Sequence, residues 1–375
     1  MASSADGAVD ALDEKVWAGV QRLIDDYAHI QRDDDVVIVY SPDAREPAAW
    51  VYVALEQRGL TPAIINMVPL RDPGFYERLS NVVPTERKTA GKCVCMIFEL
   101  HTMSHNKTIK TVFGGYGPDQ LTVIRAINSG PDLFTTGLAV HPEKLSALNT
   151  AILEMCRPAQ HLRVETPAGT DLRIELDNSR FRWISNRGIN QPGKFLIIPP
   201  GEVATYPARI DGTLVADFAI NVNTYYTDDV RLDRHPVTVR IADGRMADMS
   251  CRDPRITAFL EKSFQRTNAE RVGELGLGTN TAVRVAVPEN SHLNERVPGV
   301  HIGFGDHNQN AADTGYDCTI HIDLCAKGGR LWFDDATEPL DLEHVVPSTS
   351  PHPRLVNSED LFSDDAEEDC CGLLT

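Results

Sequence analysis

The sequence predicts an α/β N-terminal domain with a parallel sheet, followed by a strand-rich α+β domain. Two apolar runs at 36–40 and 63–67 flank a helical pattern that ends near Gly59, and this order is typical of parallel strands. From about His161 the pattern changes to short alternating strands separated by Gly, Pro and Asp turns. The length of 375 residues also exceeds what one ordinary core holds, which favours two domains.

The N-terminal elements follow from the spacing of apolar residues. Val16, Val20 and Ile24 recur at helical spacing, which predicts a helix before the first strand. Further strands are expected at 93–98, 121–127 and 138–140, and a further helix at 143–156. We therefore predict an α/β domain over residues 1–160.

The second domain is expected over residues 161–346. Short strands with alternating apolar and polar residues are expected at 162–165, 172–176 and 237–241, with a helix at 255–266. After Pro347 the sequence mixes Ser, Pro and acidic residues with little periodicity. This composition predicts a disordered acidic tail at 347–375.

Composition and charge exclude several classes of protein. The formal net charge of -18 repels phosphate backbones, so nucleic acid is not expected as a partner. No apolar run reaches the roughly 18 residues that a membrane span needs. The start of the chain also lacks the basic residues and apolar centre of a secretory signal. We therefore expect a cytoplasmic protein without a membrane partner.

Three common active-site motifs are missing from the sequence. The stretch 41–46 after the first predicted strand lacks the glycines that let a backbone approach a pyrophosphate, which disfavours a nicotinamide cofactor. No glycine-rich loop ends in Gly-Lys-Ser/Thr, and no serine stands in a Gly-x-Ser-x-Gly turn. Nucleotide-binding and serine-hydrolase functions are therefore disfavoured.

Two pairs of possible metal ligands in the first half lack the context of a known site. Cys93 and Cys95 lie in an apolar stretch without a second Cys or His cluster at zinc-site spacing, so we expect buried thiols. His101 and His105 stand four residues apart, but no Glu follows His101, and the zinc-protease helix signature is absent. We expect that pair to be a surface feature, with substrate contact as the alternative.

Acidic residues and histidines gather in the second half of the chain. His321 and Asp323 stand two residues apart in an apolar run, so strand alternation points both side chains to one face. His301 stands in a similar run, and Glu274 in a glycine-rich one. Glu202 follows a Pro-Pro-Gly turn and is expected on a loop beside a strand end. Imidazoles and carboxylates together are typical ligands of divalent ions.

Each of these residues also has a structural interpretation. Glu202 alone fits a solvated turn acid, Glu274 a cap or turn, and each histidine a hydrogen-bonded core position. Asp323 weakens the last interpretation, because a carboxylate buried beside His321 needs a cation or donor. Two histidines with three carboxylates suit two ions and a bridging carboxylate, whereas His301, His321 and Asp323 alone suit one ion. The sequence does not decide the number of ions.

Four segments, in this order, resemble the aminopeptidase T and aminopeptidase S family of metallopeptidases. They are residues 200–203, 273–280, 301–305 and 321–323, and residues 168–172 resemble that family's entry into its second domain. The similarity covers roughly residues 160–335. The N-terminal half agrees with the family only in its α/β character.

This resemblance implies a catalytic, metal-binding α+β domain, a homodimer, and two ions of zinc or cobalt. It implies that the metal-site residues are Glu202, Glu274, His301, His321 and Asp323. The ions would lower the pKa of a bridging water, polarise the scissile carbonyl and hold the free amine of a peptide, with Glu202 moving the proton. The implied function is a metal-dependent aminopeptidase-like hydrolase that releases N-terminal residues from peptides.

One residue departs from the family's pattern. The family has a functional Tyr seven residues after the first His, and this chain has Asn308 there. Tyr316 is a candidate catalytic replacement; otherwise, the lost phenol implies lost or altered hydrolysis. We expect Asn280, Asp306, His307 and Asn308 to contact the substrate, with Asp306 and His307 also able to orient the ligands.

Two further functions stay open. A ring-opening 2,5-dihydroxypyridine dioxygenase is similar to the same fold family and uses a single iron(II) on two His and one Asp. Glu274 stands where that pattern has its first His, which favours the peptidase-like set. A protein that binds a peptide or another small molecule without hydrolysing it is the third possibility.

Overall fold

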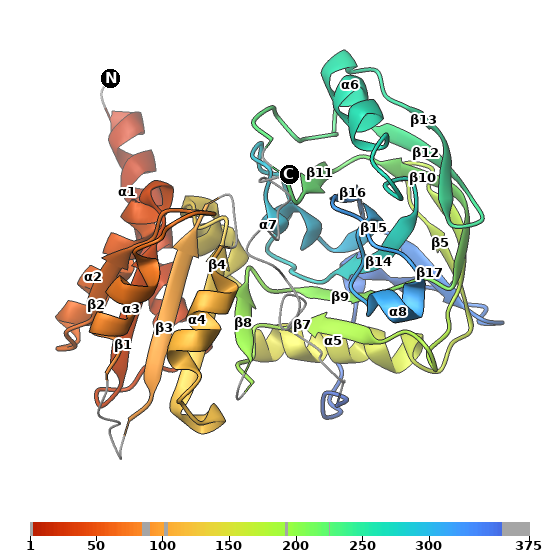
Figure 1. Ribbon diagram of the computed structural model, residues 1–375. Coiled ribbons are helices and arrows are strands. Elements are labelled where there is room, and N and C mark those ends of the chain that lie inside the picture. Colours follow the sequence, from red (N-terminus) through yellow and green to blue (C-terminus); the bar gives the residue numbers. More distant parts are fainter. Residues whose placement is uncertain (1–2, 85–90, 101–103, 192–193, 225, 355–375) are drawn as a thin grey trace.

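The structure is a computed structural model that describes residues 3–84, 91–100, 104–191, 194–224 and 226–354. Figure 1 shows a helix-covered sheet on one side, formed mainly by the N-terminal part of the chain, and a strand-rich part on the other. The described strands form sheets of five, seven and six strands. The predicted fold class, a parallel α/β part followed by a strand-rich part, is confirmed.

The first sheet has the strand order β2-β1-β3-β4-β8, and every pairing in it is parallel. Its strands are β1 (Asp35–Tyr40), β2 (Ala63–Asn66), β3 (Cys93–Glu99), β4 (Leu121–Ile127) and β8 (Phe195–Ile198). Both faces are covered, which is why the central strands are continuous apolar runs. The thiols of Cys93 and Cys95 are buried and free, as predicted. Because β8 follows residue 160, the chain returns to this sheet from its second half.

Helices cover the two faces of the first sheet. Val36 and Ile38 of β1 pack on one face, with α1 and α2, whereas Val37 and Val39 pack on the other, with α3 and α4. The helical elements here are α1 (Ser3–Arg22), η1 (Leu23–Tyr27), η2 (Pro42–Ala44), α2 (Arg45–Gln57), α3 (Phe75–Val82), α4 (Asn106–Phe113), η3 (Pro118–Gln120) and η4 (Leu133–Gly137). The strand predicted at 138–140 is wrong. Leu138 ends the turn of η4, where its N–H bonds to Leu133 O and its side chain is buried.

The other two sheets are antiparallel. The seven-stranded sheet B has the order β13-β12-β10-β6-β5-β17-β18, and the six-stranded sheet C has the order β11-β16-β15-β14-β9-β7. Sheet B contains β5 (His161–Glu165), β6 (Asp171–Glu175), β10 (Arg209–Ala216), β12 (Val237–Ala242), β13 (Arg245–Ser250), β17 (Arg330–Phe333) and β18 (Leu340–Asp341). Sheet C contains β7 (Trp183–Asn186), β9 (Glu202–Thr205), β11 (Ala219–Val222), β14 (Val272–Gly278), β15 (Gly299–Gly305) and β16 (His321–Lys327).

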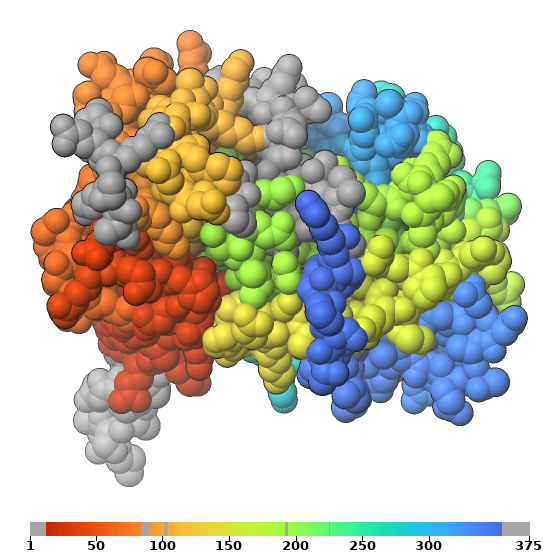
Figure 2. Space-filling model, turned by 90° about the horizontal axis from the view of Figure 1, so that it is seen from below, coloured from red at the N-terminus to blue at the C-terminus, as the bar shows by residue number. Residues whose placement is uncertain are grey.

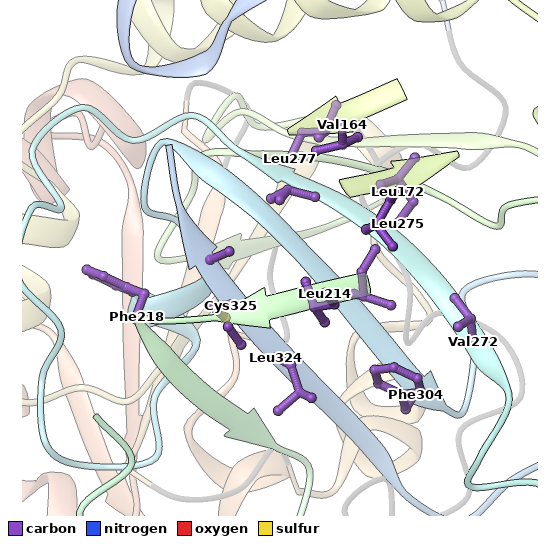
Figure 3. Packing of buried hydrophobic residues seen from close by; sticks show 14 of the residues in the cluster. Val164, Leu172, Leu214, Phe218, Val272, Leu275, Leu277, Phe304, Leu324 and Cys325 are labelled. Carbon is purple, nitrogen blue, oxygen red and sulfur yellow. The ribbon is translucent and has the colours of Figure 1, made fainter. Parts of the chain in front are cut away.

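Sheets B and C bury a shared apolar core. In Figure 3 the side chains of Leu275 and Leu277 from sheet C lie toward Val164 and Leu172 of sheet B. Helical elements around this core are α5 (Pro142–Cys156), α6 (Pro254–Ser263), α7 (His292–Glu295), α8 (Ala311–Thr314) and η5 (Leu342–His344). Because one face of sheet C is apolar by alternation, its other face is free for polar side chains.

The described C-terminal segment lies on the body of the protein. Figure 2 shows it in dark blue, crossing the lower face beside the yellow residues of α5. Ser348 donates its backbone N–H to Ala147 O at 3.0 Å, and His352 Nε2 lies 2.9 Å from Ser185 Oγ. The remainder of the predicted tail, 355–375, lies outside the described residues. No helix of the described chain is long and apolar enough to cross a membrane.

Candidate metal centre

The polar face of sheet C gathers the candidate ligands. Strand register places Glu274 of β14, Gly303 of β15 and Asp323 of β16 in one row across the sheet. Gly276 and His301 face each other in the next row. Directly opposed residues of antiparallel strands point to the same face, so the pairing of distant segments brings these side chains together.

Three local features aim the side chains correctly. A β-bulge between Val272 and Glu274 shifts the register, so that Val272 joins the apolar core while Glu274 points to the polar face. Gly276 leaves room for an imidazole, because a Cβ there would lie 1.8 Å from His301 Nε2. A Cβ at Gly303 would similarly lie 2.7 Å from the Cε1 atom of His321. The strand glycines therefore make space for both rings.

The five predicted metal-site residues meet in one cluster. His301 Nε2 lies 2.9 Å from Glu202 Oε1 and 3.6 Å from Glu274 Oε1. His321 Nε2 lies 2.9 Å from Asp323 Oδ1 and 3.8 Å from Glu274 Oε2. Glu274 thus directs one carboxylate oxygen toward each imidazole, with Glu202 on one side and Asp323 on the other.

The donor set fits a metal ion. One ligand atom each from Glu202, Glu274 and His301 lie within 4.8 Å of one another, and all three residues are buried. His301 Nε2 is buried without a hydrogen bond of acceptable geometry, although Glu202 Oε1 is near. His321 Nδ1 lies 2.9 Å from Asp306 O, a contact that holds the ring with Nε2 toward the carboxylates. An unsatisfied ring nitrogen facing carboxylates is what a cation-binding site provides.

Electrostatics in the cluster couple the acids to the imidazoles. Burial opposes ionisation of Glu202, but Arg296 and His301 outweigh it and lower the pKa of Glu202 to about 2. Burial raises the pKa of Glu274. Burial also disfavours the charged imidazolium, yet neighbouring carboxylates raise the pKa of both His301 and His321 well above the usual value. The surrounding carboxylates therefore favour the charged form of both imidazoles, as they would favour a bound cation.

Four further residues, which the sequence did not single out, surround the cluster. Arg296 pairs with Glu202, Glu295 pairs with Arg296 at 3.0 Å, and Asn221 donates to Asp323 Oδ2 at 3.2 Å. His292 is the fourth, and its Nδ1 lies 3.1 Å from Asn128 Oδ1. Burial, followed by repulsion from Arg296, lowers the pKa of His292 to about 4, so its ring is neutral. The available sequence signal was the pair of adjacent charges, Glu295 and Arg296, directly before the apolar Val297 and Pro298.

A cavity of about 80 Å³ adjoins the cluster. Ile127 of β4 and Ile197 of β8, at the carboxyl ends of two parallel strands, line one side of it. Its remaining lining residues are Ile184, Asn186, Glu202, Glu274, His292, Glu295, Arg296, His321 and Asp323. The N-terminal sheet therefore closes the site over the polar face of sheet C.

The expected loop position of Glu202 is wrong, whereas its expected role in moving protons stays a prediction. Glu202 is the first residue of strand β9 and is only 3% exposed, because the preceding turn brings it directly into sheet C. One carboxylate oxygen pairs with the guanidinium of Arg296. This pair favours the ionised form of Glu202.

The predicted substrate-contacting and catalytic residues near Tyr316 lie outside the cavity lining. Tyr316 donates its hydroxyl to Gly305 O at 3.0 Å, and its ring packs against His307. His307 Nε2 lies 2.9 Å from Tyr316 O. Asn308 accepts from Arg182 through its backbone oxygen. These contacts brace the loop after β15 instead of directing the side chains to the cluster.

Asn280 and His105 also have structural contacts. Asn280 donates both amide hydrogens to backbone carbonyls, to Gly137 O at 2.9 Å and Pro200 O at 3.1 Å, so it has none left for a substrate. The surface position expected for His105 is wrong: the residue is 5% exposed, and its Nε2 lies 2.9 Å from Val68 O. Its partner His101 lies outside the described residues.

Comparison with known proteins gives a fold relationship. The family described as crocagin biosynthetic protein CgnE/B matches residues 210–328 of this chain. The 2,5-dihydroxypyridine dioxygenase of Pseudomonas putida KT2440 superposes with a TM-score of 0.60 at 14% identity, covering 90% of this chain and 98% of the dioxygenase. The aminopeptidase AmpT of Thermus thermophilus superposes with a TM-score of 0.56 at 15% identity, covering 90% and 100%. No curated protein sequence matches the chain. At these identities the similarity shows the fold alone.

Proposed function

We propose that this protein is a metal-dependent, aminopeptidase-like hydrolase that releases N-terminal residues from peptides. The observation that supports it is the position of Glu274, whose two oxygens face two different imidazoles. His301 with Glu202 forms one half-site, and His321 with Asp323 forms the other. A shared carboxylate between two such pairs is the ligand arrangement of a two-ion centre, for which zinc or cobalt is suitable.

The residues around the half-sites have distinct tasks in this proposal. When bound, the ions would supply an acidified water and a polarised scissile carbonyl. Arg296 keeps Glu202 ionised, and Asp306 O holds the ring of His321. We keep the movement of the proton with Glu202, and His292, which lines the cavity outside the ligand set, is the second candidate.

Peptide entry requires this form of the site to open. The cavity of about 80 Å³ is much smaller than the roughly 300–1,000 Å³ typical of ligand pockets. Ile127 and Ile197 belong to the wall that the first sheet contributes. We therefore expect that wall to move away from sheet C when a peptide binds, and we expect the working form to be a homodimer, as in the resembling family.

A single-iron, ring-cleaving dioxygenase is the second candidate. It is supported by the superposition with the Pseudomonas putida enzyme over 90% of this chain. His301, His321 and Asp323 would then hold the iron. In this function the buried carboxylates of Glu202 and Glu274, which lie beside His301, would not be ligands. We therefore place it second.

Activity assays separate these functions. We expect the purified protein to release free amino acids from a peptide mixture, and both chelation and Glu274→Gln to abolish this release. Glu338→Gln, at an exposed glutamate, is the matched control and is expected to behave like the unmodified chain. Oxygen consumption after addition of ferrous iron would instead support the dioxygenase. Peptide binding without either reaction would replace both with a binding function.

A further inference from the structure

We infer that Glu295 is a positioning residue that links the two half-sites and holds their outer carboxylate oxygens in place. The inference rests on the proposed two-ion centre. Glu295 closes the short helix α7 and is 5% exposed. Its Oε1 lies 3.0 Å from Arg296 Nη2, and its Oε2 accepts a hydrogen bond from Asn221 Nδ2. One oxygen of Glu295 therefore contacts Arg296, and the other contacts Asn221.

The first direction leads to the half-site of His301. Arg296 Nη1 pairs with Glu202 Oε2, and Arg296 Nε donates to Pro199 O at 3.1 Å. Glu202 Oε1 remains toward His301 Nε2, at 2.9 Å. The guanidinium thus binds the outer oxygen of Glu202 and leaves the inner oxygen for an ion.

The second direction leads to the half-site of His321. Asn221 of β11 stands directly opposite Asp323 of β16, and its Nδ2 lies 3.2 Å from Asp323 Oδ2. Asp323 Oδ1 remains toward His321 Nε2, at 2.9 Å. The arrangement repeats that of the first half-site, with an amide in place of a guanidinium. Glu295 is the residue that the two arrangements share.

Ligation by Glu295 itself does not fit these contacts, because both of its oxygens already accept from Arg296 or Asn221. Its effect on an ion is therefore indirect. Groups that orient metal ligands typically change metal affinity by about 10- to 100-fold when they are replaced. A residue that orients one ligand in each half-site is expected to weaken both half-sites together.

Glu295→Gln is the first test. The glutamine keeps the size of the side chain, but its NH₂ group replaces one acceptor, so Arg296 and Asn221 cannot both be satisfied. Zinc binding is measured by calorimetry and by metal analysis after dialysis. We expect two bound ions in the unmodified protein and affinity at both half-sites weakened at least tenfold in Glu295→Gln. Glu338→Gln is the matched control. Two ions bound with unchanged affinity in Glu295→Gln would overturn the inference.

Measurements on the metal-free protein separate this inference from the proposed function. Histidine side-chain NMR signals report on the rings of His301 and His321 without any metal. We expect Glu295→Gln to shift both sets of signals, and Asn221→Ala, which also serves if Glu295→Gln does not fold, to shift those of His321 far more than those of His301. Unchanged His301 and His321 signals in Glu295→Gln, or equal shifts at both rings in Asn221→Ala, would refute it. Failure of the unmodified protein to bind zinc would refute the two-ion centre instead.

Discussion

Replacing Gly276 by alanine tests how the sheet makes room for the site. Gly276 stands opposite His301 in neighbouring strands, and an added Cβ would lie 1.8 Å from His301 Nε2. Ordinary contacts begin near 3.4 Å, so the ring must move by about 1.6 Å. Metal–ligand distances tolerate only about 0.2 Å. The displacement therefore removes His301 from its half-site.

The stability effect of Gly276→Ala is expected to be moderate. Overpacking of a well-packed site costs about 1–3 kcal/mol, and the lower chain entropy of alanine in the unfolded state offsets about 0.4–1 kcal/mol of that. The protein should therefore fold, with a lower midpoint in urea unfolding. The half-site of His321 does not contain this contact, so it is expected to keep its ion.

The assay compares metal content and unfolding for Gly276→Ala and a control. Gly130→Ala is the matched control, because its added Cβ would have its nearest neighbour, Leu100 Cδ1, at 3.9 Å. We expect two zinc ions in the control and no more than one in Gly276→Ala. If Gly276→Ala binds two ions with the affinity of the control, the claim that His301 is a ligand held over this glycine is refuted.

Three further predictions concern protons and packing. Neighbouring carboxylates raise the pKa of His301 and His321, so a bound ion must displace protons from these rings. Apparent zinc affinity should therefore rise with pH near neutrality, by about tenfold per pH unit for each displaced proton. Calorimetry in buffers of different ionisation enthalpy that detects no proton release would contradict this. Burial and Arg187 lower the pKa of His352 from 6.5 to about 4, so the folded protein favours the neutral ring. The free energy of unfolding should therefore fall as the pH drops from 6.5 to about 4, and urea unfolding of His352→Gln should show a smaller fall over the same range. Leu275→Ala, in the core between sheets B and C, should lower the free energy of unfolding by about 2–5 kcal/mol; an unchanged urea midpoint would argue against that core.

The fold could be predicted because its signals are local. Continuous apolar runs such as β1 and β3 indicate buried parallel strands, and alternating runs such as β6 and β12 indicate the antiparallel sheets. The strand expected at 138–140 failed because short apolar runs also occur in irregular turns next to helices. The return of β8 to the first sheet could not be predicted, because strand pairing between distant segments has no local signal.

The candidate site was predictable in part. Strand alternation alone predicts that His321 and Asp323 share a face, and in the structure His321 Nε2 lies 2.9 Å from Asp323 Oδ1. The environment of Glu202 was not predictable, because Arg296 reaches it from a segment 94 residues away. The contacts of Glu295 to two half-sites likewise depend on the position of α7 beside β11, which only the tertiary structure provides.

The central claim is that Glu274 stands between two cation-binding half-sites. The direct test is a crystal of the zinc-loaded protein, with anomalous scattering recorded at the zinc edge. We predict two peaks, one beside His301 and Glu202 and one beside His321 and Asp323, with an oxygen of Glu274 directed at each. A single peak held without Glu274, or no peak in the cluster, would contradict the account.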